Sequence, residues 1–477
     1  MKKSNMAISV GLIALCIIGW LSVTIQKVED NSSYQTYIKE ADGWVKEGLY
    51  QRAITSYKNA IAEEPTADLY KKAAKAYQLR KKEVASDIEA TDEIEGEYVA
   101  FLEEATSFFP AEADLVDALA DYYLKEEEYQ EAYDCLMEAM DQGYDTEKVR
   151  KKWLQAKYAY DLKGDCFDKI KTSGGSVYTV SEDGAWSTYV VGEGYRMNTK
   201  YKDAGIANED GDVVVTGKDS RLISGEGVVL GIFQKKVTEA GVFAEGLVPA
   251  MCDGTYHYYD EFAEEQFGGY EMASMFQNGK AAVKKDGKWM LIDTKGKVVS
   301  DKYAHIVLDA SGKYVINEKI LAAKKKGNYA IYNEKMKEKQ KIDGTEVDVL
   351  TEDGWIAFCQ KGKWGYMNLD GKVVIKPQYE AAKSFSNGMA AVKNGDNWGF
   401  INEDNELVLE GRFTDAGYMN EAGVCAVRMD KPLEETSEEE TSEEETSEEE
   451  TSEDDTEGDS MEIWQFLQLE LGIIEGL

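Results

Sequence analysis

A run of oxygen-bearing side chains, Asn-Glu-Asp-Gly-Asp at residues 208–212, has the chemistry to coordinate a calcium ion. An EF-hand loop requires a glutamate at the twelfth position and helices on both sides. The twelfth position is Asp219, and the surrounding pattern does not indicate helices. The equivalent place in a later unit reads Asp-Thr-Lys-Gly-Lys, residues 293–297, with lysine in place of acid. The segment is therefore predicted to be a glycine-containing hairpin turn.

The histidines and cysteines do not indicate a metal site or a catalytic site either. The two histidines, His257 and His305, stand 48 positions apart (305 − 257), and both fall in predicted strands, where we expect packed or surface roles. The cysteine spacings fit no zinc site, and four of the cysteines are expected to act as small apolar residues: Cys135, Cys252, Cys359 and Cys425. There is no Walker loop or nucleophile elbow, and Gly-Glu-Gly at residues 192–194 lacks the third glycine of a dinucleotide loop. The sequence thus predicts no catalytic residue, no metal site and no cofactor.

The composition limits the classes of partner. Acidic residues outnumber basic ones by 91 to 54 in 477 residues, which gives a formal net charge of −37. Nucleic acids and anionic lipids bind to basic patches, so binding of this acidic chain to nucleic acid is not expected. The 42 glycines, against only 5 prolines, and the 29 tyrosines favour tight turns and aromatic strands. The length corresponds to about three domains of ordinary size.

An uncharged run near the start of the chain extends from Met6 to Ile25. A helix of this length is about 30 Å long and would cross the hydrocarbon core of a bilayer. Lys2 and Lys3 precede the run, so the positive-inside rule places the N-terminus in the cytoplasm and the bulk of the chain outside. The alternative is a cleaved signal peptide, but the run is long for one and lacks a cleavage site of small residues. We therefore expect residues 1–30 to be a single-pass signal anchor in the cell membrane.

Residues 31–163 have the three-and-four spacing of apolar residues that indicates amphipathic helices. In one unit, a helix lined by Ala53, Tyr57 and Ala60 ends before Pro65. A second unit lies near residue 120, a degenerate one near residue 74, and residues 146–162 are expected to form a capping helix. The arrangement resembles the tetratricopeptide repeat, and this resemblance implies an α-solenoid with a concave protein-binding groove. A generic helical bundle is the alternative.

From about residue 165 to residue 477 the apolar period changes to two, as in half-buried strands. One aromatic position recurs at intervals of 33 (289 − 256), 40 (329 − 289), 35 (364 − 329) and 34 (398 − 364) residues. The element Gly-Lys-Trp-Gly at residues 362–365 makes this region similar to the WG-repeat family, although only two units keep the Trp-Gly pair. The resemblance implies a repeated meander of three short strands. The repeat-defining aromatic residues are Tyr256, Trp289, Tyr329, Trp364, Trp398 and Trp464.

These aromatic residues are expected to be structural. A three-stranded meander cannot bury both faces alone, so the units must stack, and a large side chain at a fixed place would fill the space between neighbours. A carbohydrate-binding platform is the alternative. With weaker echoes at Ala204 and Leu230, eight units can be counted, which suffices to close a propeller. An open array is the alternative, because the first two intervals are short, at 26 residues each (230 − 204 and 256 − 230).

Residues 431–460 form an acidic low-complexity run in which Glu-Thr-Ser-Glu-Glu recurs. Low hydrophobicity and self-repulsion predict a disordered spacer, and a weak divalent-cation or basic-partner site is the alternative. Trp464 follows Trp398 by 66 residues (464 − 398), and the 30 residues of the run account for nearly all of the excess over the previous interval of 34. We therefore expect the run to be an insertion in the hairpin turn of the last unit, between a strand at residues 423–429 and the strand of Trp464.

Together these patterns predict a multidomain α plus all-β chain, with a single transmembrane helix, a tetratricopeptide-like α-solenoid and a propeller-like WG-type β-repeat array. We expect a membrane-anchored extracytoplasmic binding or scaffold protein of the cell envelope, with envelope proteins as partners and no enzymatic activity. The alternative is an enzyme that binds or modifies an envelope polymer through a carboxylate active site, because such catalysts need no local motif. A ligand sensor would need a separate membrane partner, since few residues precede the expected anchor.

Overall fold

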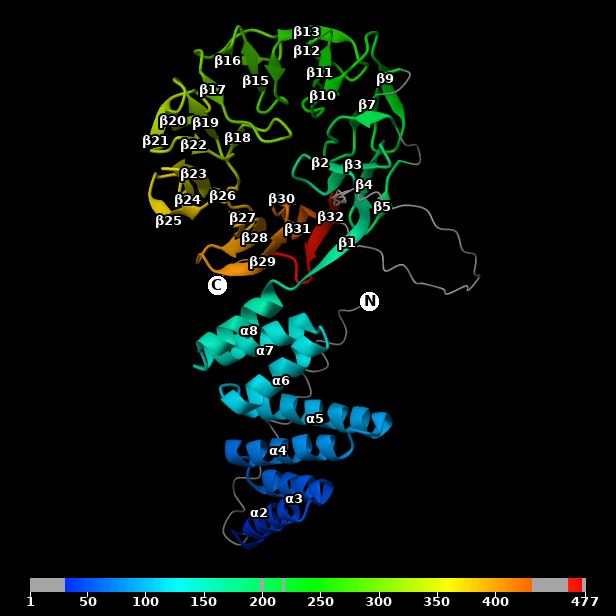
Figure 1. The fold of residues 1–477 in the computed structure, drawn as a ribbon, viewed down its shortest axis with the longest axis vertical. Coiled ribbons are helices and arrows are strands. Elements are labelled where there is room, and N and C mark those ends of the chain that lie inside the picture. Colours follow the sequence, from blue (N-terminus) through cyan, green and yellow to red (C-terminus); the bar gives the residue numbers. More distant parts are fainter. Residues whose placement is uncertain (1–30, 198–200, 217–218, 431–461, 474–477) are drawn as a thin grey trace, which may run out of the picture. The chain divides into compact units, whose positions relative to one another are not determined.

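A computed structural model describes residues 31–197, 201–216, 219–430 and 462–473 (Figure 1). The chain divides into two compact units, Met1–Lys157 and Tyr158–Leu477. The described part of the first unit is helical and the second is an eight-bladed β-propeller.

The helical unit consists, in its described part, of seven helices that follow one another as stacked neighbours (Figure 1). The side chains of Thr66 and Asp87 cap two of the helices by accepting hydrogen bonds from backbone N–H groups three residues on. Ala53, Tyr57 and Ala60 are buried. The two alanines are small and let adjacent helices approach closely, and the ring of Tyr57 fills the remaining space. The helices are α2 (Asn31–Lys46), α3 (Tyr50–Glu63), α4 (Ala67–Glu83), α5 (Ile88–Phe108), α6 (Ala113–Lys125), α7 (Tyr129–Asp141) and α8 (Glu147–Lys157).

The fold class predicted above requires a correction. Within the described ranges, no helix is both long and apolar enough to cross a bilayer. Even α5, with 21 residues, carries acidic side chains along its length. The described part of the chain is therefore seven helices followed by a propeller, and none of these helices is the transmembrane helix that the prediction placed first. The run from Met6 to Ile25, on which that prediction rested, lies outside the described residues.

Each blade of the propeller is an antiparallel sheet. In blades 1 to 7 the strands follow one another outward in sequence order, apart from one short strand of blade 5 that lies off this path. Blades 1 to 3 contain β2 (Lys169–Thr172), β3 (Val177–Glu182), β4 (Ala185–Val190) and β5 (Gly194–Tyr195); β6 (Asp203–Ala204), β7 (Val213–Thr216), β8 (Arg221–Ile223) and β9 (Val229–Ile232); and β10 (Glu239–Ala240), β11 (Val248–Cys252), β12 (Thr255–Tyr259) and β13 (Glu265–Tyr270). Blade 4 contains β14 (Met272–Ala273), β15 (Lys280–Lys285) and β16 (Lys288–Asp293).

The remaining blades repeat this order. Blades 5 to 7 contain β17 (His305–Ile306), β18 (Val315–Ile316), β19 (Lys319–Ala323), β20 (Tyr329–Asn333) and β21 (Glu338–Lys341); β22 (Glu346–Val347), β23 (Ile356–Gln360), β24 (Lys363–Met367) and β25 (Val373–Tyr379); and β26 (Ala381–Ala382), β27 (Met389–Asn394), β28 (Asn397–Asn402) and β29 (Leu407–Phe413). Blade 8 contains β30 (Asp415–Ala416), β31 (Val424–Asp430), β32 (Glu462–Leu469) and, as its outer strand, β1 (Tyr160–Phe167).

The ring is closed by β1, which comes from the start of the unit and pairs with β32 at its end, from Tyr160 opposite Leu469 to Phe167 opposite Trp464. The open-array alternative is therefore wrong. The predicted capping helix ended at residue 162, whereas α8 ends at Lys157, and this pairing explains the difference. The chain must be extended from Tyr160 onward to complete the last blade.

The strand that contains Trp464 lies where the spacing argument placed it. β31 pairs with β32 along its whole length, with Arg428 opposite Trp464 and Asp430 opposite Glu462. The acidic run connects these two paired ends, and residues 431–461 lie outside the described residues. In the chain the run therefore stands between two strands of one hairpin.

The unit count of eight is correct, but the first two predicted units are wrong. Ala204 lies in β6 and Leu230 in β9, so both belong to blade 2. Blade 1 was missed, although it carries Trp186 at the start of β4. In blade 2 the equivalent place at the start of β8 is Arg221, 35 residues after Trp186 (221 − 186) and 35 before Tyr256 (256 − 221).

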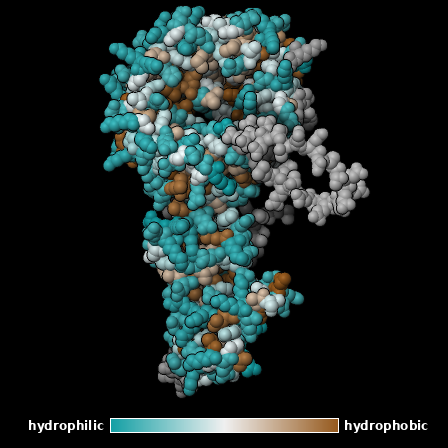
Figure 2. Space-filling model, in the orientation of Figure 1, coloured by the Kyte–Doolittle hydropathy of each residue, from teal (hydrophilic) through white to brown (hydrophobic). Residues whose placement is uncertain are grey.

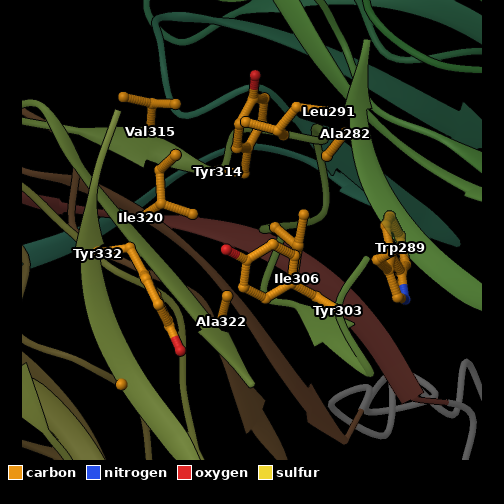
Figure 3. Packing of buried hydrophobic residues seen from close by; sticks show 11 residues of the cluster. Ala282, Trp289, Leu291, Tyr303, Ile306, Tyr314, Val315, Ile320, Ala322 and Tyr332 are labelled. Atoms are coloured by element: carbon orange, nitrogen blue, oxygen red, sulfur yellow. The ribbon is translucent and has the colours of Figure 1, made fainter. Parts of the chain in front are cut away.

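The core is divided into clusters between neighbouring blades. Figure 3 shows one of them, in which Trp289 and Leu291 of blade 4 lie on one side and Tyr314, Ile320 and Tyr332 of blade 5 on the other. Each cluster is built from residues about one repeat apart, so no blade buries its two faces without its neighbours.

Candidate functional site

The predicted aromatic positions are distributed around the ring, one to a blade, and the structure does not bring them together. Trp289 is 4% exposed and Tyr256 8% exposed, and each lies in a cluster shared with the following blade. Tyr329, Trp364 and Trp464 are partly buried against similar clusters. The ring of Trp398 instead has the Nζ atom of Lys383 5.6 Å from its centroid. Five of the six aromatic residues thus lie against clusters between neighbouring blades.

In the Trp-Gly pairs, the residue after the tryptophan must be glycine for a steric reason. At Gly365 an added Cβ atom would lie 2.5 Å from the backbone nitrogen of Pro377, and at Gly399 it would lie 2.6 Å from the carbonyl oxygen of Leu409. Both glycines stand where the outer strand bulges against the strand of the tryptophan. In blade 3 the glycine stands on the outer strand instead, because Gly268 of β13 lies opposite His257 of β12.

The loops between the first and second strands of the blades lie on one side of the ring, and we call them the loop face. They comprise residues 173–176, 205–212, 241–247, 274–279, 307–314, 348–355, 383–388 and 417–423.

Hydrogen bonds between neighbouring blades form a belt that closes around the ring, mostly through the loop face. The carboxylate of Asp353 accepts bonds from the backbone N–H groups of Asn387 and Gly388, at 2.9 and 2.8 Å. The amide of Asn420 bridges blade 8 to blade 1 by donating to the carbonyl of Gly175 and the hydroxyl of Tyr178. The other junctions use Ala207–Thr179, Asn208–Phe243, Gly279–Glu245, Gln277–Tyr314, Asn317–Glu352 and Ser386–Met419.

The loops of blades 1 to 5 enclose a hollow of about 330 Å³ on this face. Its lining carries four acidic side chains and one lysine, together with apolar surface from Val242, Phe243 and Met275. The charged residues are Glu209, Asp210, Asp212, Glu245 and Lys313. An acidic rim over an apolar floor suits a partner segment that combines basic and apolar side chains.

Blades 6 to 8 present a different polar cluster. Tyr418 donates its hydroxyl to Asp348, with oxygen–oxygen distances of 2.9 and 2.8 Å to the two carboxylate oxygens, and the backbone N–H of Ser384 donates to the same carboxylate at 2.6 Å. Burial raises the pKa of Asp348, and these two donors oppose that rise. Burial and the neighbouring carboxylate raise the pKa of the Tyr418 phenol. Lys383 lies beside the cluster, 3.5 Å from Asp415. The carboxylate is thus engaged by donors from two other blades.

The residues considered for metal or catalytic chemistry occupy ordinary structural positions. Asn208 accepts from the backbone N–H groups of Gly211 and Asp212, which closes the predicted turn. His257 contacts Thr255 and Glu265, while His305 is half-buried beside Trp289 and Tyr329, and its burial lowers its pKa. Throughout the described ranges, no group of three or more His, Cys, Asp or Glu side chains could hold a metal ion.

The belt of hydrogen bonds was not predicted from the sequence. A signal for it exists, because Phe-Ala-Glu-Gly, Phe-Gln-Asn-Gly and Phe-Ser-Asn-Gly stand before the second strands of blades 3, 4 and 7, at residues 243–246, 276–279 and 385–388. In each, the residue before the glycine has a positive φ, as a tight turn requires. Phe276 and Phe385 are fully buried under these turns.

A family model described as a WG-containing repeat matches residues 269–289, 364–398 and 398–431. The propeller contains WG repeats. The matched segments include Trp289, Trp364 and Trp398, so the resemblance inferred from the aromatic spacing is confirmed for these repeats. All three segments lie in the propeller, and the tetratricopeptide resemblance of residues 31–163 has no such support.

No curated protein is significantly similar to the chain. Among solved structures, BamB from Moraxella catarrhalis matches with a TM-score of 0.43 and 12% sequence identity over 65% of this chain and 100% of that chain. Hsv2 from Kluyveromyces lactis matches with a TM-score of 0.33 and 8% identity over 57% of this chain and 95% of that chain. PorZ from Porphyromonas gingivalis matches with a TM-score of 0.30 and 9% identity over 57% and 43%.

Proposed function

We propose that this chain is a protein-binding scaffold whose WG-repeat propeller holds a partner at the loop face. The observation that supports the proposal is the hollow of about 330 Å³, to which five successive blades contribute loops. The hydrogen-bond belt fixes these loops against one another, so the surface is formed before a partner arrives. Preorganisation of this kind lowers the entropic cost of binding.

The partner at this face is a protein segment with basic and apolar side chains. Glu209 and Asp210 are exposed at the rim, and Lys313 is the counter-charge in the lining. The net charge of −37 would draw a basic segment toward the chain and repel an acidic one. Charges at a rim act mainly on the rate of association and on the choice of partner.

The helical unit provides a second, separate surface. A hollow of about 370 Å³ in it is lined by Pro65, Tyr70, Phe101 and Phe108, with Lys58 and Glu104 as its charged residues. Tyr70 donates a hydrogen bond to Glu104 at 2.7 Å, and its ring packs against those of Phe101 and Phe108. Aromatic residues with a polar rim are typical of peptide-binding surfaces, so the scaffold has one such surface in each unit.

The proposal assigns no reaction to the chain. An enzyme that modifies an envelope polymer would need a carboxyl group free to approach its substrate. Asp348 has the raised pKa of a candidate acid, but Tyr418 and Ser384 already occupy its oxygens. Its arrangement favours a structural role.

An extracytoplasmic location in the cell envelope is also part of the proposal. It rests on the sequence alone, because two lysines followed by an uncharged run are also the pattern of a secretory signal peptide. Protease added to wall-free cells should digest the propeller, and full protection of the propeller in such cells would contradict this location.

Crosslinking in producing cells tests the scaffold proposal. A photoreactive amino acid at position 209 should trap a specific protein, and Asp210→Lys in the same chain should lower the yield at least about tenfold. The matched control is Glu410→Lys, which reverses an exposed acid on β29 away from the loop face. Equal yields from the three proteins, or crosslinks to polysaccharide only, would contradict the proposal.

A further inference from the structure

The outer strand of blade 2 differs from the outer strands of five other blades. Those of blades 3, 5, 6, 7 and 8 each contain charged side chains, and β25 also contains Pro377. Charges and proline on an edge strand prevent it from pairing with another chain. β9 has neither, since it reads Val-Leu-Gly-Ile. Its side chains are nevertheless open to solvent, with Leu230 38% and Ile232 52% exposed.

The edge of β9 is free within the part of the chain that the structure describes. The sheet order β6-β7-β8-β9 ends with this strand. Its hydrogen bonds to the neighbouring strand lie on one side only, including Phe233 N–H to Ser220 and Ser224 N–H to Val228. The opposite side presents backbone donors and acceptors that an added strand could use.

The turn of the next blade contains a second exception. Blades 3 to 7 each turn between their second and third long strands with an Asp or Asn whose side chain accepts from the backbone. Two positions after that residue, blades 4 to 7 have an exposed charged residue: Lys295, Lys335, Asp370 and Asp404. Blade 3 has Phe262 there, and its side chain is 63% exposed.

The two exceptions lie side by side. A Cβ atom at Gly231 of β9 would stand 2.3 Å from the carbonyl carbon of Phe262, so the strand and the turn are in backbone contact. Outer strand and following turn also meet in other blades, at Phe267–Gly296, Gln340–Gly371 and Tyr379–Asn405. The repeat therefore places charged turns at these seams and an apolar surface at this one. On the face visible in Figure 2, the surface is mostly hydrophilic, and hydrophobic residues appear in small groups. A continuous apolar edge is thus unusual for this protein.

We propose that β9 and Phe262 form a docking site where an extended segment of another protein, with alternating apolar and basic residues, adds as a strand to β9. The inference rests on the proposed scaffold function and assigns it a second surface. Glu226, Glu261 and Glu264 are exposed around the site, while Lys235 is engaged by Asp253 and Glu265. A basic partner complements this rim. A second copy of the chain would bring another formal charge of −37, which disfavours self-association.

Hydrogen exchange on the full chain tests the docking site. The probe is a synthetic peptide of about ten residues with alternating valine and lysine, long enough for one strand. The control peptide has the same sequence with alternate backbone nitrogens methylated, so that it keeps the charge but cannot pair as a strand. The unmethylated peptide should slow amide exchange within residues 228–232 at least about tenfold, and the methylated one should not.

Matched variants locate the binding. Leu230→Lys with Phe262→Lys should weaken peptide binding at least about tenfold, because lysine removes the apolar contact and repels the probe. The variant should fold, since lysine already occupies the equivalent turn position in Lys295 and Lys335. Leu407→Lys, at a leucine of β29 that is 59% exposed, should leave binding unchanged.

Three results would overturn the inference: equal binding of the methylated peptide, equal loss in Leu407→Lys, or a concentration-dependent dimer that the β9 variant abolishes. Crosslinking in cells separates this inference from the proposed function. If the partner trapped at position 209 is retained in the β9 variant and the peptide does not bind, the docking site is wrong while the scaffold proposal stands. If neither surface captures its ligand, both fail.

Discussion

The hydroxyl of Tyr418 donates to both carboxylate oxygens of Asp348, which belongs to a blade two positions earlier in the ring. Lys383 stands midway in the sequence, 35 residues from each (383 − 348 and 418 − 383). The ring of Tyr418 lies under the Lys383 ammonium, 5.6 Å from ring centroid to Nζ. One repeat position therefore supplies an acid, a base and a phenol that meet where three blades converge, and this cluster joins blades 6 and 8 directly.

Removing the phenol hydroxyl should weaken the propeller. Tyr418→Phe leaves a largely buried carboxylate with one fewer donor, and we expect the free energy of unfolding to fall by about 1–3 kcal/mol. Urea unfolding measures this change. Tyr379→Phe is the matched control, because its hydroxyl donates to Asn405 at 2.7 Å in an exposed position and should cost less than about 1 kcal/mol. Equal losses in the two variants would contradict a special role for Tyr418.

The same carboxyl should give the stability a pH dependence. Burial raises the pKa of Asp348 from its ordinary value of 3.8, so the folded chain holds this proton more tightly than the unfolded chain does. Its contribution to stability is therefore fully present below the ordinary value and declines as the pH rises through the raised pKa. Asp348→Asn removes this decline. The free energy of unfolding of the wild type minus that of the variant should fall between pH 3.8 and neutral pH. A difference that rises with pH would contradict the assignment.

The glycines of the Trp-Gly pairs should not tolerate a methyl group. Gly365→Ala and Gly399→Ala place a Cβ atom within 2.6 Å of the outer strand's backbone, and we expect each to cost about 1–3 kcal/mol through displacement of that strand. Gly411→Ala is the control, since the nearest atom would be 3.5 Å away, at ordinary contact distance. Thermal unfolding of the three variants tests the argument, which fails if Gly411→Ala is the most destabilised.

The aromatic spacers should be needed for their volume. Trp289→Ala removes a side chain that is 4% exposed between blades 4 and 5, and it should cost about 3–5 kcal/mol. Trp289→Tyr should cost less, because Tyr256 and Tyr329 occupy the same place in the flanking blades. Urea unfolding measures the free energy of unfolding of the two variants. If both are as stable as the wild type while binding to sugar polymers is lost, the aromatic residues are platforms and not spacers.

The sequence predicted the repeat wherever an aromatic residue marks it. Tyr256, Trp289, Tyr329, Trp364 and Trp398 all begin the second long strand of a blade. Blade 1 was not predicted, because Arg221 stands at the aromatic position of blade 2. The aromatic residues Trp186 and Tyr256 are therefore two repeats apart and do not show the regular interval. Packing between blades requires volume, and the aliphatic stem of an arginine can supply part of it. The aromatic signal is therefore a frequent solution to the packing problem and not a requirement.

The polar contacts of the loop face could not be predicted in the same way. Asp348 and Tyr418 are ordinary residues in their local sequences, and only the closed ring brings them together. The closure itself depends on β1, whose residues look like the end of a helical region because they precede the repeats. Similarly, Asn420 and Tyr178 are 242 residues apart in sequence (420 − 178) and meet only across the junction of blades 8 and 1.

The acidic run should be dispensable for the fold, whereas the strand after it should not. Asp430 and Glu462 are directly paired, so their Cα atoms are about 5 Å apart and a short turn can join them. Excising residues 432–459 leaves Lys431, Ser460 and Met461 as a hairpin connection of ordinary length. Shortening the connection lowers the entropic cost of closing it by about 0.6 kcal/mol per halving, so stability should be retained or slightly raised.

Truncation after Asp430 has the opposite effect, because it removes β32. This strand lies between β31 and β1, so its loss leaves β1 without a partner, leaves β31 paired with β30 alone, and opens the ring. The core between blades 8 and 1 also loses Phe466, which is fully buried against Phe167 and Tyr189. We expect the truncated chain to lose its cooperative thermal transition and to be cut rapidly by protease within residues 160–167, while the excised chain resists like the wild type. Equal protease resistance of the two proteins would show that β32 is not needed to close the propeller.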